Sequence, residues 1–98
     1  MTLIAEHTPI TATAKGHRVW LQGTGRYGWP VGTRYNLSYD GDSIVLERDA
    51  EGKRKVSKGK GGIIDLTSKK VSQWAGDSEV ANVFTNGSDV IIFEKVWS

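Results

Sequence analysis

The feature that most constrains this chain is a pattern that occurs twice within its 98 residues. The segments YDGDSIVLER (residues 39–48) and TNGSDVIIFEK (residues 85–95) share one order of features. Each has the end of a strand, a turn with glycine, a β-branched run, and an acid followed by a base. Asp-Gly or Asn-Gly between such runs indicates a β-hairpin, because both central residues of a type I′ turn require positive φ. We therefore expect one hairpin unit in two copies.

The repetition extends upstream of both hairpins, to RVWL at residues 18–21 and IIDL at residues 63–66. The offset between the two copies is 45 or 46 residues, and it rises to 47 at the closing acid–base pair. The corresponding positions are Leu21 and Leu66, Leu37 and Val83, Asp40-Gly41 and Asn86-Gly87, and Ile44 and Val90. A period of this length indicates a duplicated supersecondary unit. Alternating apolar residues then predict six strands, near residues 18–22, 34–39, 43–48, 62–66, 80–85 and 89–95.

The connectors between the first strand and the hairpin differ in the two copies. QGTGRYGWPVG (residues 22–32) is rich in glycine and is expected to be irregular. LTSKKVSQWAGD (residues 66–77) has Val71 and Trp74 at helical spacing behind a capping Thr or Ser, which predicts one or two helical turns. The sequence leaves two interpretations for Trp29 and Trp97: each can be an exposed binding anchor or a buried residue. The expected core comprises Trp20, Leu21, Tyr35, Leu37, Ile44, Leu46, Ile64, Leu66, Val83, Ile91 and Phe93.

A chain of this length is expected to form a single domain, residues 1–98, with a modest core. It divides into an N-terminal extension expected to be mobile (1–16), a first repeat (17–48), a basic linker (49–61) and a second repeat (62–96). Cysteine is absent, which excludes disulfides and thiolate metal sites. No apolar run reaches the roughly 18 residues of a membrane span, and the first residues lack the features of a secretory signal. These observations favour a cytoplasmic protein with no membrane association.

Charge is unevenly placed along the chain although the net charge is only +2. Residues 48–70 contain eight bases and three acids, which leaves five bases and eight acids elsewhere. Such a segment indicates either a nucleic-acid footprint or a solvated loop. The linker GKRKVSKGKGG (residues 52–62) has the same two interpretations, a flexible join or a basic arm that orders on a phosphate backbone.

Catalytic chemistry is poorly represented in this composition. Nucleophilic triads require a Ser, Thr or Cys beside a positioned base, and His7 and His17 are the only histidines. DGD at residues 40–42 lacks the rest of a calcium loop, and the linker lacks the glycine spacing of a phosphate-binding P-loop. We therefore expect no enzyme activity, no catalytic or metal site and no cofactor.

A strand, a short connector and a hairpin is similar to the unit of the AbrB/MazE/SymE swapped-hairpin family. The resemblance covers GIIDLTSKKVSQWAGDSEVANVFTNGSDVIIFEK (residues 62–95) and, in the SymE-like variant, RVWLQGTGRYGWPVGTRYNLSYDGDSIVLER (residues 18–48). Two such units interleave their hairpins into a small barrel, usually as a homodimer. The resemblance therefore implies an all-β swapped-hairpin barrel made by two tandem strand–connector–hairpin repeats, with at most a short helical turn. It also implies either a monomeric pseudo-dimer or a homodimer.

The resemblance further implies bases that reach phosphates and groove edges, on the first strand and on the connector. They fall on Arg18 at the start of the first strand and on Lys69 and Lys70 in the second connector. Arg26 fills one position of the equivalent pair in the first connector, where its neighbour is Gly25. The linker adds bases that can follow a phosphate backbone, and these are Lys53, Arg54, Lys55, Lys58 and Lys60.

The leading hypothesis is a small nucleic-acid-binding protein, a DNA-binding regulator whose bacterial or phage origin is implied by the family alone. DNA is favoured over RNA as the partner. One alternative is a protein-binding module, such as an antitoxin or a phage-encoded inhibitor of a host defence complex. A second alternative is a SymE-like toxin that targets RNA.

Overall fold

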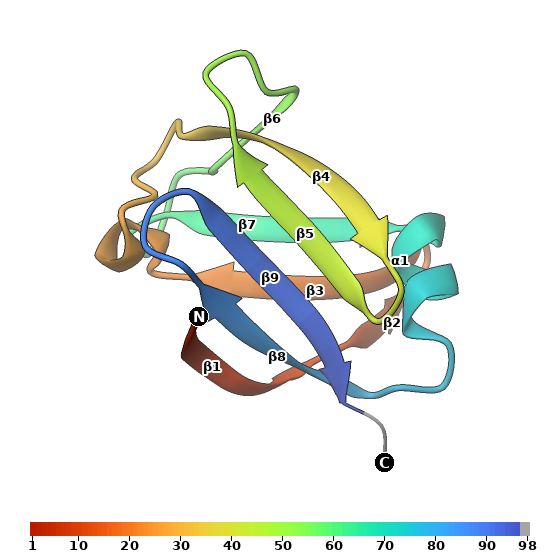
Figure 1. Cartoon of the computed structure of the whole chain (residues 1–98). Coiled ribbons are helices and arrows are strands. Elements are labelled where there is room, and N and C mark those ends of the chain that lie inside the picture. The colour runs from red at the N-terminus through yellow and green to blue at the C-terminus, as the bar shows by residue number, and fades with distance from the viewer. Residues whose placement is uncertain (97–98) are drawn as a thin grey trace.

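The computed structural model describes residues 1–96, and most of these residues lie in antiparallel strands. The larger sheet has the order β1-β8-β9-β5-β4-β6, with β1 (Thr2–Pro9), β4 (Arg34–Asp40), β5 (Ser43–Arg48), β6 (Arg54–Lys55), β8 (Val80–Thr85) and β9 (Val90–Val96). The smaller sheet has the order β2-β3-β7, with β2 (Thr11–Thr13), β3 (Gly16–Gln22) and β7 (Ile63–Ser68). Figure 1 shows β3 and β7 crossing behind the larger sheet. The all-β prediction is confirmed, but the described strands form two sheets rather than the expected closed barrel.

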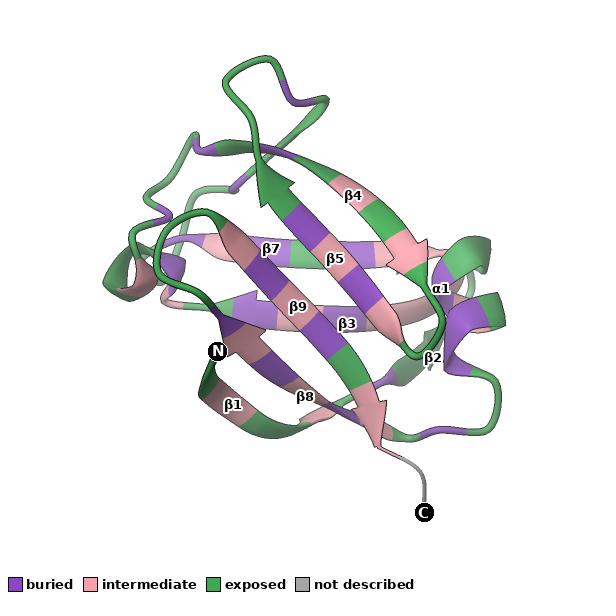
Figure 2. Cartoon of the chain, viewed as in Figure 1, coloured by how far each residue is buried: buried purple, intermediate pink, exposed green. Residues whose placement is uncertain are grey.

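The core lies between the two sheets and is built from alternate residues of five strands. Side chains of successive strand residues point to opposite faces, so the buried residues of β3, β5, β7, β8 and β9 lie two positions apart along each strand (Figure 2). Nine of the eleven expected core residues are buried. Leu37 is only partly buried against the core, and Trp20 lies on the opposite face of β3 from the buried Val19 and Leu21.

The first hairpin turn differs by one residue from its predicted position. Asp40 pairs with Ser43, so the central residues of the turn are Gly41 and Asp42. Of these two, only Gly41 has a positive φ, at 57°. Positive φ at the first central residue alone is the pattern of a type II′ turn, and the predicted type I′ turn centred on Asp-Gly is wrong.

The second hairpin has one more residue in its loop. The Asn86 N–H donates to the Val90 carbonyl (3.3 Å), and the Val90 N–H donates to Asn86 Oδ1 (3.0 Å), which leaves residues 87–89 in the turn. This additional residue raises the offset between the copies from 46 to 47 inside the turn. Ile44 therefore corresponds to the buried Ile91 and not to Val90.

The N-terminal extension is part of the fold, and its predicted mobility is wrong. β1 pairs with β8 at the edge of the larger sheet, and β2 pairs with β3 in the smaller one. The β1–β8 register shifts twice, and at the second shift His7 has φ 53° and its N–H donates to Asn82 Oδ1 (2.9 Å). Such irregularities make an edge strand a poor template for further pairing.

The basic linker is also ordered. Its β6 strand pairs with the start of β4, and Ser57 forms a bridge with Ile63. Val56 between them is 1% exposed, and its N–H donates to the Thr33 carbonyl (2.9 Å). The linker therefore joins the two sheets instead of forming the mobile arm that its glycine and lysine content predicted.

The two connectors take different helical forms. The second contains α1 (Lys69–Ala75), capped by Ser68, whose hydroxyl accepts from the Val71 N–H (3.2 Å), as the sequence predicted. The first, expected to be irregular, contains the 3-10 helix η1 (Thr24–Tyr27) and the buried Trp29, whose ring lies 5.6 Å from the Tyr35 ring. Trp29 is therefore a core residue, while Trp97 lies outside the described residues.

Strand pairing follows the sequence repeat. Trp20 pairs with Asp65, 45 residues later, and Val45 pairs with Ile92, 47 residues later. These pairs join equivalent positions of the two copies, and the pairs on either side follow in reversed order. This is the register that a twofold relation between the copies requires.

A second repeat appears in the connectors, in WPVGT (residues 29–33) and WAGDS (residues 74–78). Both tryptophans are buried, and so are Thr33 and Ser78. The N–H of Thr33 donates to the carbonyl three residues before it (3.0 Å), and that of Ser78 does the same (2.9 Å). Each connector therefore ends in a four-residue turn closed by the same hydrogen bond, but the positive φ falls on the second central residue, Gly32, in the first turn and on the first central residue, Gly76, in the second.

Candidate nucleic-acid interface

The structure divides the nine predicted binding residues into three groups. Arg18 lies on β3 itself, and Lys69 and Lys70 begin α1. The remaining six lie in the first connector and the linker, with Arg26, Lys58 and Lys60 near the end of β3 and the start of β7, and Lys53, Arg54 and Lys55 beside the start of β4. The six residues of β7 separate this last group from α1 by about 20 Å, at about 3.3 Å per residue. The nine bases therefore do not form one continuous patch.

We call the end of the molecule where β3 ends and β7 begins the basic end, made of residues 23–34 and 48–63. These segments contain eight bases and two acids. Two of the bases, Arg34 and Arg48, were not among the predicted binding residues. Arg34 Nη1 donates to the Gly52 carbonyl (3.0 Å), and Arg48 Nη1 donates to the Gly28 carbonyl. Both arginines therefore join loops of the basic end and add to its charge.

The outer face of the β3–β7 pair has Trp20 near its centre. Because side chains alternate along β3, Trp20 lies opposite the core, on the same face as Arg18. The Arg18 Cζ atom is 5.3 Å from the centroid of the Trp20 ring, and Lys60 Nζ is 5.8 Å from it. Both distances are within the range of cation–π attraction. The indole therefore lies beside one cation from its own strand and one from the basic end.

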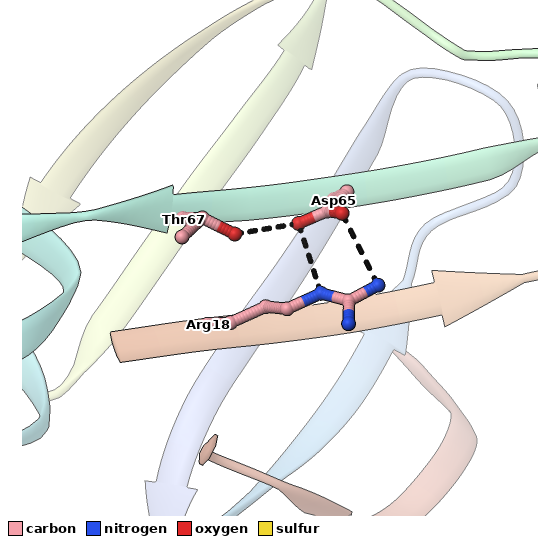
Figure 3. A network of polar contacts seen from close by, with 3 residues as sticks. All are labelled: Arg18, Asp65 and Thr67. Carbon is pink, nitrogen blue, oxygen red and sulfur yellow. Dashed lines mark hydrogen bonds and ion pairs between the residues drawn. The ribbon is translucent and has the colours of Figure 1, made fainter. Parts of the chain in front are cut away.

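Arg18 is held in place by a polar network (Figure 3). Its Nε and Nη2 atoms each lie 3.2 Å from an oxygen of Asp65 on β7. The Thr67 hydroxyl donates to Asp65 Oδ1 (2.8 Å). Both side chains of the ion pair are 40% exposed, so its main effect is to orient Arg18 rather than to stabilise the fold.

A hollow of about 430 Å³ opens beside Lys60 at the basic end. Its lining contains two bases and no acid, and comprises Gln22, Gly23, Gly25, Arg26, Lys60 and Gly61. Among the described residues, neither Arg26 nor Lys60 takes part in an ion pair. A concave surface with two uncompensated cations favours an anionic group.

The backbone around Lys60 is fixed by contacts with the first connector. The Gly25 N–H donates to the Gly61 carbonyl (2.9 Å), and the Thr24 N–H donates to the Gly62 carbonyl (3.2 Å). Gly62 has φ 103°, and a Cβ at this position would overlap the Thr24 hydroxyl. Lys60 itself has φ 45°, which is unusual for a residue with a side chain. Lys60 and Arg26 therefore stand on a rigid support.

At the opposite end, Lys69 and Lys70 are exposed on the first turn of α1. Lys70 lines a second hollow, of about 360 Å³, with Tyr39, Gln73 and Trp74. Because Val71 and Trp74 are buried under α1, both lysines have a fixed backbone. Both lysines lie at the end of β7 that is away from Lys60, where Figure 1 shows α1.

Two titratable side chains, His17 and Tyr35, are partly or fully buried. His17 is half-buried, and its Nδ1 atom and its backbone N–H both lie 2.7 Å from Ser72 Oγ, which joins β3 to α1. Burial raises the pKa of the Tyr35 hydroxyl above its ordinary value, although the nearby charge of Arg54 opposes the shift.

Within residues 1–96, no three His, Asp or Glu side chains gather as a metal site would require. In the same residues, no helix has the length and apolar character to cross a bilayer.

Sequence reasoning missed Trp20 as a half-buried residue of the outer face, and Arg34 and Arg48 as members of the basic end. Strand alternation could have placed Trp20 opposite Val19 and Leu21, because residues that alternate along a strand face opposite sides. The predicted hairpin could have placed Arg34 beside Arg48, since these residues begin and end its two strands. Comparisons with family models, with curated proteins and with solved structures find no match to this chain.

Proposed function

We propose that this chain is a small nucleic-acid-binding protein, a DNA-binding regulator built from two copies of a swapped-hairpin unit. The observation that carries the proposal is the basic end, where two segments of the chain, residues 23–34 and 48–63, collect eight bases and two acids. Collecting like charges on one surface raises the electrostatic energy of the free protein. A phosphate backbone relieves this repulsion and releases counterions.

The twofold register supports the duplicated unit. Trp20–Asp65 and Val45–Ile92 are pairs of equivalent positions, as expected when two copies of one unit associate about a twofold axis. The repeated Trp-x-x-x-Thr/Ser spacing, with both of its ends buried, is further support from outside the strands. With both copies in one chain, the pair of subunits that the swapped-hairpin family uses is replaced by a monomer.

The state of the cations supports binding through phosphates. Within residues 1–96, Arg18 alone of the nine predicted residues forms a direct ion pair with a carboxylate. The other eight keep their charge available to a ligand, with some on each side of the outer face of β3 and β7. A nucleic acid lying across this face would meet Arg26 and Lys60 at one end and Lys69 and Lys70 at the other.

Salt dependence of binding tests the proposal. If about six bases meet phosphates, the logarithm of the association constant for duplex DNA falls with the logarithm of salt concentration at a slope of about −5. We would measure this by fluorescence anisotropy on one random duplex. Absence of binding at low salt would overturn the proposal and favour a protein partner.

A matched pair of variants tests the location of the site. Lys60→Gln and Lys15→Gln change the net charge equally, but Lys15 lies in the β2–β3 turn, outside the basic end. We expect Lys60→Gln to flatten the slope by about 0.9, and Lys15→Gln, whose neighbour Gly16 adjoins Lys69, to flatten it less. Equal effects would show that general charge, and not the basic end, drives the binding.

A further inference from the structure

We infer that the outer face of β3 and β7 binds unpaired nucleotides, with a base stacked on Trp20 and the adjoining phosphate in the hollow lined by Arg26 and Lys60. This inference rests on the proposed function and adds to it the strandedness of the ligand. It also assigns separate roles to the aromatic ring and to the two cations beside it.

The position of Trp20 is the first argument. A large apolar ring on the solvent side of a strand contributes little to the core. The core residues of β3 are Val19 and Leu21, on the other face of the strand. Trp20 is instead the centre of the β3–β7 pairing, opposite Asp65. Proteins that bind single strands place aromatic rings on such open faces, because every base has a face that can stack.

The cations beside the ring are the second argument. Lys60 lies next to Trp20 and also lines the hollow that contains Arg26. A second, smaller hollow of about 130 Å³ lies on the other side, lined by residues that include Arg18, Trp20 and Thr11. Trp20 thus has a hollow with a base on each side. Because Arg18 is paired with Asp65, the hollow lined by Arg26 and Lys60 is the one suited to the phosphate that adjoins a stacked nucleotide.

The backbone of Lys60 is the third argument. Its φ of 45° costs free energy, and such strain persists only where the surrounding structure enforces it. The hydrogen bonds from Gly25 and Thr24 to Gly61 and Gly62 provide that enforcement. The strained backbone holds Lys60 near the Trp20 ring, as pre-organised binding requires.

Unpaired bases fit this face better than the major groove of a duplex does. Groove reading requires side chains that are free to donate to or accept from base edges. On this face Arg18 and Asp65 bind each other, and Thr67 donates to Asp65, so the polar side chains near the centre are already engaged. The Trp20 ring remains as the group that can contact a base, by stacking.

The test compares an eight-nucleotide oligo(dT) with a random duplex of eight base pairs, using the parent and two variants. Trp20→Leu removes the ring at constant charge. Phe84→Leu removes a ring from β8 in the other sheet, and is the matched control. Binding is followed by anisotropy of a labelled oligonucleotide, after thermal unfolding shows that each variant is folded. Trp20→Phe is included because it keeps an aromatic ring.

We expect Trp20→Leu to weaken oligo(dT) binding roughly 5- to 150-fold, the effect of losing one stacked base, while its salt slope stays the same. Duplex binding should change little, Trp20→Phe should restore part of the affinity, and Phe84→Leu should bind like the parent. The double variant Arg26→Gln/Lys60→Gln should instead flatten the oligo(dT) slope by about 1.4.

The outcomes separate the inference from the proposed function. If the duplex binds and oligo(dT) does not, or if Trp20→Leu weakens both equally, the stacking site is wrong and nucleic-acid binding stands. If neither ligand binds the parent at low salt, both are wrong. Quenching of tryptophan fluorescence by oligo(dT) that persists in Trp20→Phe would also overturn the stacking site.

Discussion

Replacing Val56 by alanine tests whether the basic linker is a structural element. Val56 is 1% exposed, and the change removes two methyl groups from the core. Their transfer to water costs about 1.6 kcal/mol, at about 0.8 kcal/mol per group. The cavity that they leave adds about 1 kcal/mol, so the expected loss is about 2.5 kcal/mol. A domain of this size has about 5–15 kcal/mol of stability in total.

The assay is urea unfolding followed by circular dichroism, with Val31→Ala as the control. Val31 undergoes the same chemical change at a side chain that is 48% exposed, so it should cost less than about 0.5 kcal/mol. In urea, we expect Val56→Ala to lower the free energy of unfolding and to leave the denaturant slope unchanged. In a thermal melt, the same loss of stability lowers the midpoint by roughly 10–20 °C. If both variants have the same small effect, residues 53–60 form a mobile arm and the reasoning about a rigid basic end is refuted.

Three further predictions address the backbone, the pH response and the binding residues. Gly62→Ala should be clearly less stable than Gly32→Ala in the same urea assay. Both residues have positive φ, but the new Cβ overlaps a hydroxyl at Gly62 and meets nothing within 4 Å at Gly32. Burial raises the pKa of Tyr35, so its neutral form stabilises the fold fully below the unfolded pKa of about 10, and this stabilisation is lost as pH rises above 10. Between pH 9 and pH 11, the free energy of unfolding should therefore fall less in Tyr35→Phe than in the parent. The double variant Lys69→Gln/Lys70→Gln should flatten the duplex salt slope by up to about 1.8 units in anisotropy titrations, and an unchanged slope would remove α1 from the interface.

The repeat and the alternation of apolar residues predicted the six main strands, because both patterns depend on local periodicity. The same patterns predicted β3, β5, β7 and β9 as the source of the core. They could not predict the role of β1, because an edge strand with two register shifts has no regular alternation. Alternation along β3 could have placed Trp20 opposite Val19 and Leu21, but Trp20 was assigned to the core for its hydrophobicity.

The linker shows why the candidate site was only partly predictable. Its glycines and lysines are typical of a flexible join, and Val56, as a single valine among polar residues, gives no alternating pattern that would predict a strand. Its order comes from contacts with Thr33 and with β7, which are distant in sequence. The proximity of Lys60, Arg26 and Trp20 likewise depends on how the two repeats pair. Charge counting identified the segment that supplies most bases of the basic end, but only the tertiary structure shows that Arg34 and Arg48 join its loops.

The most direct test of the central claim is chemical-shift mapping of the ¹⁵N-labelled protein titrated with a random twelve-base-pair duplex at low salt. The account predicts that the largest shifts fall on the amides of residues 18–26 and 57–63, with smaller shifts at Lys69 and Lys70. Amides of β1, β8 and β9 in the other sheet should barely move, and their signals are the internal control. Largest shifts on β1, β8 or β9, or no shifts at all, would contradict the claim that the basic end and the outer face of β3 and β7 bind nucleic acid.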